Sequence, residues 1–126
     1  MFLVKTKLGL SKIHGIGVFA DEDISKDMLV QKFIDGVDLE IIPEIVNALP
    51  KLIRQNLLHY AYKHKTTGNF ILNSDDARFL NSSKNPNLIG SNSYKEADMA
   101  ARDIAKGEEL TVYYDDFDVL ASEKLR

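Results

Sequence analysis

The chain is built from short apolar segments that turn-forming residues interrupt every few positions, and this pattern limits the folds it can adopt. Alternating runs of four to seven residues bounded by Gly, Asn, Asp or Ser are typical of short strands. We predict strands at residues 2–6, 17–20, 28–34, 59–64, 69–73, 99–104 and 110–114. The sequence therefore predicts a mainly β fold with short helices.

Two short helices are expected in the middle of the chain. Apolar residues recur there at intervals of three and four, the spacing of an amphipathic helix. Pro43 and Pro50 each suit a first helical turn. We predict helices at 43–48 and 51–59. Turns are predicted at 66–69 and 105–108, and the turn at 105–108 closes a hairpin. Residues 116–126 are predicted to have weak helical character.

Composition narrows the class of protein. A chain of 126 residues suits one domain, taken here as 1–126. The absence of cysteine excludes disulfides, thiolate zinc sites and a cysteine nucleophile. No apolar run approaches the ~20 residues of a membrane span, and the N-terminus lacks a secretion signal, so an intracellular protein is expected. A net charge of -3 argues against nucleic-acid binding and suits a basic partner.

Taken singly, the polar motifs carry little information. Gly15 and Gly17 fall short of a dinucleotide fingerprint and read as a plain turn. The Asn81 to Asn87 stretch reads as a loop. Tyr113 and Tyr114 should point to opposite faces of a strand, and whichever points inward reads as a core tyrosine. The acidic residues Glu108, Glu109, Asp115, Asp116 and Asp118 lack the pattern of a calcium loop and are taken as solvated charge. The three histidines lack zinc-ligand spacing, and neither a nucleophile elbow nor a phosphate-binding loop is present.

Taken in order, three segments resemble the SET domain, the fold of many protein lysine methyltransferases. SKIHGIGVFA at 11–20 resembles S-x-x-x-G-x-G-V-F-A, and RFLNSSKNPN at 78–87 resembles R-F-I-N-H-S-x-x-P-N. ARDIAKGEELTVYY at 101–114 resembles A-x-R-D-I-x-x-G-E-E-L-T-x-x-Y. The resemblance covers nearly the whole chain.

The resemblance implies a SET-domain fold of small curved sheets with a pseudoknot-like C-terminal threading, and no zinc-binding segments before or after the domain. It implies an S-adenosylmethionine-dependent lysine methyltransferase acting on a lysine-containing basic protein, histone-like or other, and it leaves a homodimer open. Tyr114 and Tyr60 are the implied catalytic residues, with Tyr62 as the alternative to Tyr60. The implied cofactor-binding residues are Gly15, Ile16, Gly17, Arg78, Asn81, Ser82, Tyr114 and Phe117.

The chain departs from the family pattern at several positions. Ser82 stands where the family has histidine, Asp115 where glycine is frequent, and Val112 where relatives often carry the aromatic residue that limits the number of methyl groups added. A second hypothesis is therefore a catalytically weak or inactive SET-like module that binds a peptide or a partner.

Overall fold

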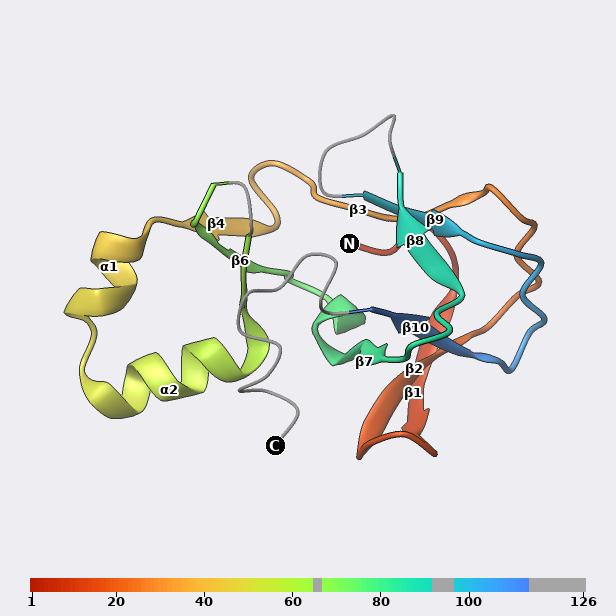
Figure 1. Cartoon of the computed structure of the whole chain (residues 1–126), viewed down its shortest axis with the longest axis horizontal. Coiled ribbons are helices and arrows are strands. Elements are labelled where there is room, and N and C mark those ends of the chain that lie inside the picture. Colours follow the sequence, from red (N-terminus) through yellow and green to blue (C-terminus); the bar gives the residue numbers. More distant parts are fainter. Residues whose placement is uncertain (65–66, 92–96, 114–126) are drawn as a thin grey trace.

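Three small sheets and two short helices make up the computed structural model, which describes residues 1–64, 67–91 and 97–113 (Figure 1). The first sheet has the order β1-β2-β10-β7, formed by Thr6–Leu10, Ile16–Ala20, Glu109–Val112 and Asn81–Ser82. The second has the order β3-β9-β8, formed by Leu29–Lys32, Ala97–Ala100 and Leu88–Gly90. The third has the order β4-β6-β5, formed by Leu39–Ile41, Phe70–Leu72 and Tyr62–Lys63. The two helices are α1 (Pro43–Ala48) and α2 (Lys51–Tyr60), and a single 3-10 turn, η1, spans Asp76–Phe79.

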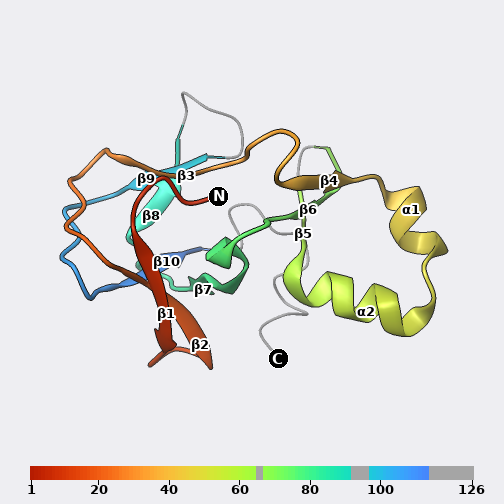
Figure 2. The same cartoon turned by 180° about the vertical axis from the view of Figure 1, so that it is seen from behind.

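The first two sheets share one hydrophobic core. Figure 2 shows them on one side of the molecule, with α1, α2 and the third sheet on the other. The buried members of the core come from β2, β3, β8, β9, β10, η1 and the segments between them: Val18, Ala20, Ile24, Val30, Ala77, Leu80, Leu88, Ala100, Ile104, Leu110 and Val112. Burial of these side chains is the main stabilising contribution to the region that holds the three family-like segments.

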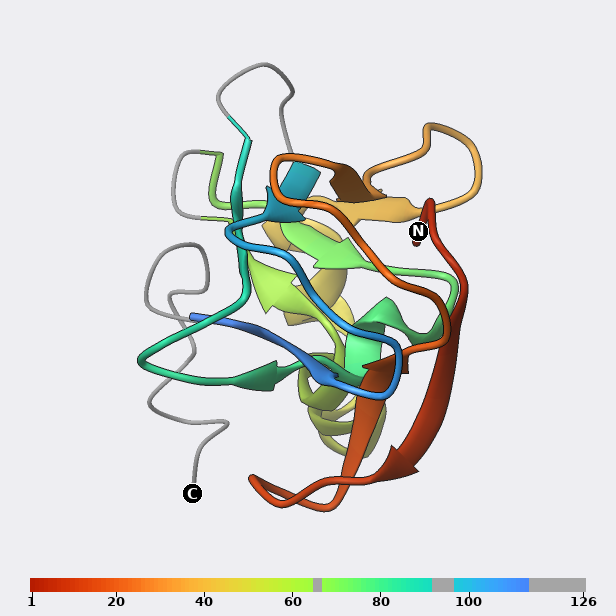
Figure 3. The same ribbon diagram turned by 90° about the vertical axis from the view of Figure 1, so that its right-hand side faces the viewer.

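Strand β10 occupies the centre of the first sheet. It pairs antiparallel with β2, where Leu110 faces Val18, and parallel with β7, where Thr111 faces Asn81. Figure 3 shows β7 and β10 side by side. Strands β7 and β10, which are far apart in the sequence, therefore extend the sheet that the β1–β2 hairpin begins. The expected pseudoknot-like threading also involves the tail after residue 113, which lies outside the described residues, and it stays a prediction.

Several predictions are confirmed. α1 has the predicted bounds, with Pro43 at its first position, and α2 ends one residue later than predicted. Pro50 caps α2 rather than entering its first turn. The mainly β character is also confirmed, since most described elements are short strands. The predicted helical character of 116–126 falls outside the described residues.

Other predictions are wrong because strand partners depend on distant residues. The first strand begins at Thr6, since the backbone before it lies along β3, where the Leu3 N–H donates to the Val30 carbonyl at 2.8 Å. His59 and Tyr60 belong to α2 rather than to a strand. The predicted hairpin of strands 99–104 and 110–114 does not form, because Ile104, after β9, pairs instead with Ile24.

Four short elements were not predicted at all. β4, β7, β8 and η1 have only two to four residues each, too few to show a period in the sequence. β7 and η1 lie within the 78–87 segment, which sequence composition alone presents as a loop.

Candidate functional site

The side-chain amide of Asn81 joins two of the family-like segments. Its Nδ2 lies 3.0 Å from the carbonyl oxygen of His14 and 3.2 Å from that of Ile16. Asn81 is only 8% exposed and sits on β7, which β10 holds in register. The glycine turn and the 78–87 segment, separated by more than sixty residues, therefore meet at one amide.

A carboxylate that the sequence analysis assigned to solvent completes this contact. Glu109 Oε2 accepts a hydrogen bond from Asn81 Nδ2 at 2.9 Å, and the two carboxylate oxygens lie 2.8 and 2.9 Å from the Ser11 hydroxyl. The interpretation of Glu109 as solvated charge is wrong. No local signal separates Glu109, the first residue of β10, from Glu108, which precedes the strand. Glu108 bonds to Arg102 and to the Ala105 N–H.

The two glycines of the turn have different surroundings. Gly15 has a φ of +47°, and an added Cβ would meet no atom within 4 Å. At Gly17 an added Cβ would lie 2.4 Å from Glu109 Oε2 and 3.1 Å from Ser11 Cβ. The turn thus exposes backbone at Gly15 and is closely packed at Gly17. Its Ile16 side chain is 50% exposed.

A second group of predicted residues gathers at the end of α2. The Arg78 guanidinium carbon lies 5.3 Å from the centre of the Tyr60 ring, within the range of a cation–π contact. Phe79 meets the same ring in a T-shaped arrangement at 5.9 Å. Arg78 also donates to the Asn73 carbonyl oxygen at 3.1 Å. The guanidinium of Arg78 therefore contacts the ring of Tyr60, and its predicted contact with the cofactor stays a prediction.

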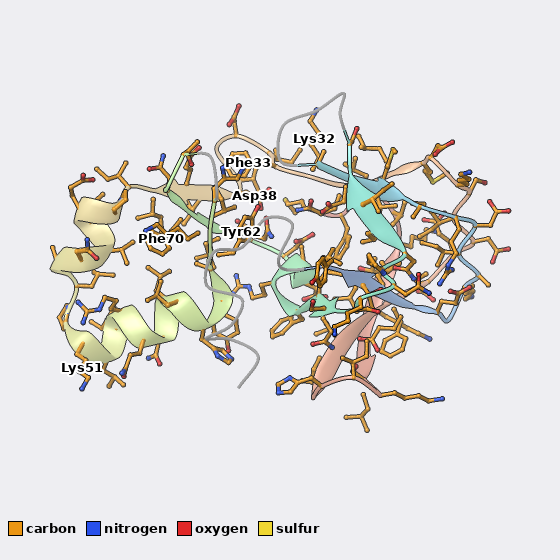
Figure 4. All side chains as sticks on the ribbon, viewed as in Figure 1. Lys32, Phe33, Asp38, Lys51, Tyr62 and Phe70 are labelled. Carbon is orange, nitrogen blue, oxygen red and sulfur yellow. The ribbon has the colours of Figure 1, made fainter. Side chains whose placement is uncertain are left out.

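Tyr62, the alternative to Tyr60, lies on β5 and is less exposed (labelled in Figure 4). Ser82 follows Asn81 on β7, opposite Val112. Tyr114 and Phe117 fall outside the described residues, so their predicted roles stay predictions. Of the predicted site residues that the structure describes, Gly15, Ile16, Gly17 and Asn81 come together, while Tyr60 and Arg78 form a separate group.

Among the described residues, no cluster of three or more His, Cys, Asp or Glu side chains could hold a metal ion. Among the helices in those same ranges, none has the length and apolar character needed to cross a membrane.

Most of the chain matches a known family. The family model described as the SET domain matches residues 15–115, and the chain therefore belongs to the SET domain family. The match includes the glycine turn, the 78–87 segment and β10, the parts that Asn81 and Glu109 connect.

Similarity to a histone-lysine N-methyltransferase agrees with this assignment. The chain is 27% identical over 126 aligned positions to a Candida albicans histone-lysine N-methyltransferase specific for lysine 36 of histone H3, which covers 87% of this chain. Only 14% of the Candida protein is matched.

Solved structures with the same fold are also found. A Plasmodium falciparum protein provisionally assigned as a histone methyltransferase has a TM-score of 0.60 and 24% identity, covering 88% of this chain and 93% of that one. Chaetomium thermophilum Polycomb Repressive Complex 2 bound to S-adenosylmethionine has a TM-score of 0.64 and 21% identity, covering 97% of this chain and 16% of that one. At these identities the likeness shows the fold.

Proposed function

We propose that this protein is an S-adenosylmethionine-dependent protein-lysine N-methyltransferase. The observation that supports it best is the contact of Asn81 with the glycine turn, because the family resemblance assigns both to the cofactor site. The name of the Candida relative supports the same reaction class. A lysine-bearing basic protein is the proposed substrate, as the net charge of -3 also favours.

The residues present fit such a cofactor at the glycine turn. Because an added Cβ at Gly15 would meet nothing within 4 Å, the backbone there faces open space that a ligand can approach closely. In the proposed site, the backbone of Gly15, Ile16 and Gly17 and the residues Asn81 and Ser82 hold the cofactor. Arg78, Tyr114 and Phe117 complete the proposed set.

When bound, S-adenosylmethionine would supply a methyl group on a positively charged sulfur. A neutral lysine amine would bond to the methyl carbon, the electron pair of the broken carbon–sulfur bond would stay on sulfur, and the methylated ammonium would then lose a proton to water. The protein must align the amine and exclude water. A free lysine has a pKa of about 10.4, so it is mostly charged at neutral pH. Aromatic walls such as Tyr60 would disfavour the charged amine through desolvation and so promote loss of its proton. Tyr114 is proposed to orient the amine through its hydroxyl.

The decisive experiment measures transfer of labelled methyl groups to a pool of lysine-rich proteins. We expect activity in the natural protein and at least about a hundredfold loss in Tyr114→Phe, since a misplacement of the reacting amine by about 1 Å can cost this much. Tyr113→Phe is the matched control and should stay active. Absence of both cofactor binding by calorimetry and methyl transfer would refute the proposal.

A second candidate is a SET-like module that binds a peptide or partner without methylating it. Ser82, in place of the family histidine, favours it because an imidazole available for packing and hydrogen bonding is lost. Ser82→His separates the two candidates. A variant that binds S-adenosylmethionine when the natural protein does not would favour the binding module.

The homodimer, the intracellular location and a single domain over 1–126 stay predictions.

A further inference from the structure

Glu109 links three segments of the chain through one carboxylate. It lies on β10 opposite Phe19 of β2, and its oxygens accept hydrogen bonds from Ser11, before the glycine turn, and from Asn81, on β7. Among the described residues, no lysine or arginine forms an ion pair with it. The donors on this carboxylate are therefore neutral groups that belong to the turn and to the strand beside it.

The carboxylate also fixes the orientation of the Ser11 hydroxyl. A hydroxyl has one hydrogen to donate and two lone pairs that can accept. Ser11 Oγ gives its hydrogen to Glu109, which leaves the lone pairs for the N–H groups of Ile13 at 2.9 Å and His14 at 3.2 Å. The Ser11 N–H in turn donates to the Gly15 carbonyl at 2.8 Å. The shape of the turn thus depends on the carboxylate behind it.

The same carboxylate sets the space behind the turn. Gly17 packs so closely against Glu109 that a Cβ could not fit without displacing it. Asn81 Nδ2 is shared between Glu109 and the carbonyls of His14 and Ile16, so the carboxylate also orients the amide that holds the turn. Removing Glu109 leaves the hydroxyl of Ser11 and the amide of Asn81 without their common acceptor.

We infer that Glu109 is the positioning residue of the proposed cofactor site, holding residues 11–17 and Asn81 in the arrangement that the cofactor binds. This inference rests on the proposed function. Glu109 is not placed on the substrate or on the transferred methyl group, so it acts through the turn. Its loss should weaken cofactor binding much more than it slows the bound enzyme.

Calorimetry with S-adenosylmethionine tests this on the full chain. For Glu109→Ala we expect a loss of affinity of about tenfold or more, because charge-assisted hydrogen bonds are the strong ones. The KM for the cofactor should rise by a similar factor while kcat changes less than threefold. Glu108→Ala is the matched control and should bind as the natural protein does, since its side chain faces Arg102 and Ala105. Equal losses in the two variants would overturn the inference.

A double-mutant cycle with Ser11→Ala tests the coupling. If both residues act through one contact, Ser11→Ala weakens binding in the natural background and has little further effect once Glu109 is alanine. If the two substitutions reduce the binding free energy additively, Ser11 and Glu109 do not act through one contact.

A measurement without cofactor keeps the inference distinguishable from the proposed function. Hydrogen exchange at the amides of Ile13 and His14 should accelerate in Glu109→Ala and remain unchanged in Glu108→Ala. The comparison is made at the same interval below the melting temperature of each variant, so that a difference in global stability does not cause the acceleration. Acceleration in a protein that binds no S-adenosylmethionine would uphold the role of Glu109 in shaping the turn and reject the proposed function. Unchanged exchange would reject the role itself.

Discussion

Asn87 and Thr111 exchange two hydrogen bonds. The Thr111 N–H donates to Asn87 Oδ1 at 2.8 Å, and the Asn87 N–H donates to Thr111 Oγ1 at 3.2 Å. The Asn87 side chain also donates to the Glu109 carbonyl at 2.8 Å, and Asn87 is only 2% exposed. The end of the 78–87 segment therefore satisfies backbone groups of β10 that would otherwise be buried without a partner.

Replacing Asn87 by alanine should destabilise the fold. The N–H of Thr111 and the C=O of Glu109 would lose their partner, and each buried unsatisfied group costs about 1–3 kcal/mol. We expect the free energy of unfolding to fall by about 2 kcal/mol or more in urea titration. Asn85→Ala, at an exposed position of the same segment, is the control and should change it by less than about 0.5 kcal/mol. An equal loss of unfolding free energy in the two variants would show that the contacts of Asn87 with β10 are not the cause of the destabilisation.

Asp38 should make stability depend on pH in the acid range. Its buried carboxylate, labelled in Figure 4, accepts bonds from the N–H groups of Ser74 and Ile34 and from the Met1 ammonium. Burial, the largest single influence, raises the pKa of Asp38, but these partners together outweigh it and lower the pKa below its ordinary 3.8. The carboxylate therefore stabilises the fold fully above about pH 4, and this contribution is lost as pH falls through the lowered pKa of the folded state.

Asp38→Asn tests this dependence. We expect the variant to be less stable by about 2 kcal/mol at pH 7, because asparagine has one acceptor oxygen where Asp38 accepts at two, and its NH2 group cannot accept. The difference from the natural protein should shrink as the pH drops below 4. Asp35→Asn, at an exposed neighbouring position, should show no such trend. A difference that stays constant with pH would argue against the charge of Asp38 as the cause.

Gly17→Ala should weaken cofactor binding through Glu109. The new Cβ would lie 2.4 Å from Oε2, so the carboxylate must move away from Ser11 and Asn81. We expect a loss of affinity for S-adenosylmethionine of about tenfold, measured by calorimetry. Gly90→Ala adds the same methyl group where nothing lies within 4 Å and should bind normally.

Tyr60 and Tyr62 are the two candidates for the aromatic wall of the lysine channel, and alanine variants separate them. Tyr60 is held by Phe79 and Arg78 at the end of α2 and is 38% exposed. We expect Tyr60→Ala to lower kcat for methyl transfer by about tenfold or more, because a lysine pKa that rises by one unit without the ring leaves about tenfold less neutral amine. Tyr62→Ala should stay near the natural rate. The reverse order would move the assignment to Tyr62.

Added S-adenosylmethionine should raise the melting temperature. A ligand that binds only the folded state stabilises it by about 2.7 kcal/mol at a hundred times its dissociation constant. Thermal unfolding at rising cofactor concentration measures this effect, with adenosine alone as the control. An unchanged melting temperature up to millimolar cofactor would contradict an intact site.

The sequence determined the family and the helices of this protein. Local signals sufficed for α1, since Pro43 and the three- and four-residue spacing act within one short segment. The order of three segments predicted the SET family, which the match over residues 15–115 confirms. Gly15, Ile16, Gly17 and Asn81 were predicted together, and the structure brings them together.

Only the tertiary structure decided how the strands pair and what Glu109 does. The Ser11 hydroxyl and the Glu109 carboxylate are 98 residues apart, and no periodicity of the sequence connects them. β7, with two residues, exists because β10 offers it a partner. A strand obtains its hydrogen bonds from a distant segment, whereas a helix obtains them within itself. For that reason β4, β7, β8 and the acceptor behind the glycine turn became visible only in the folded chain.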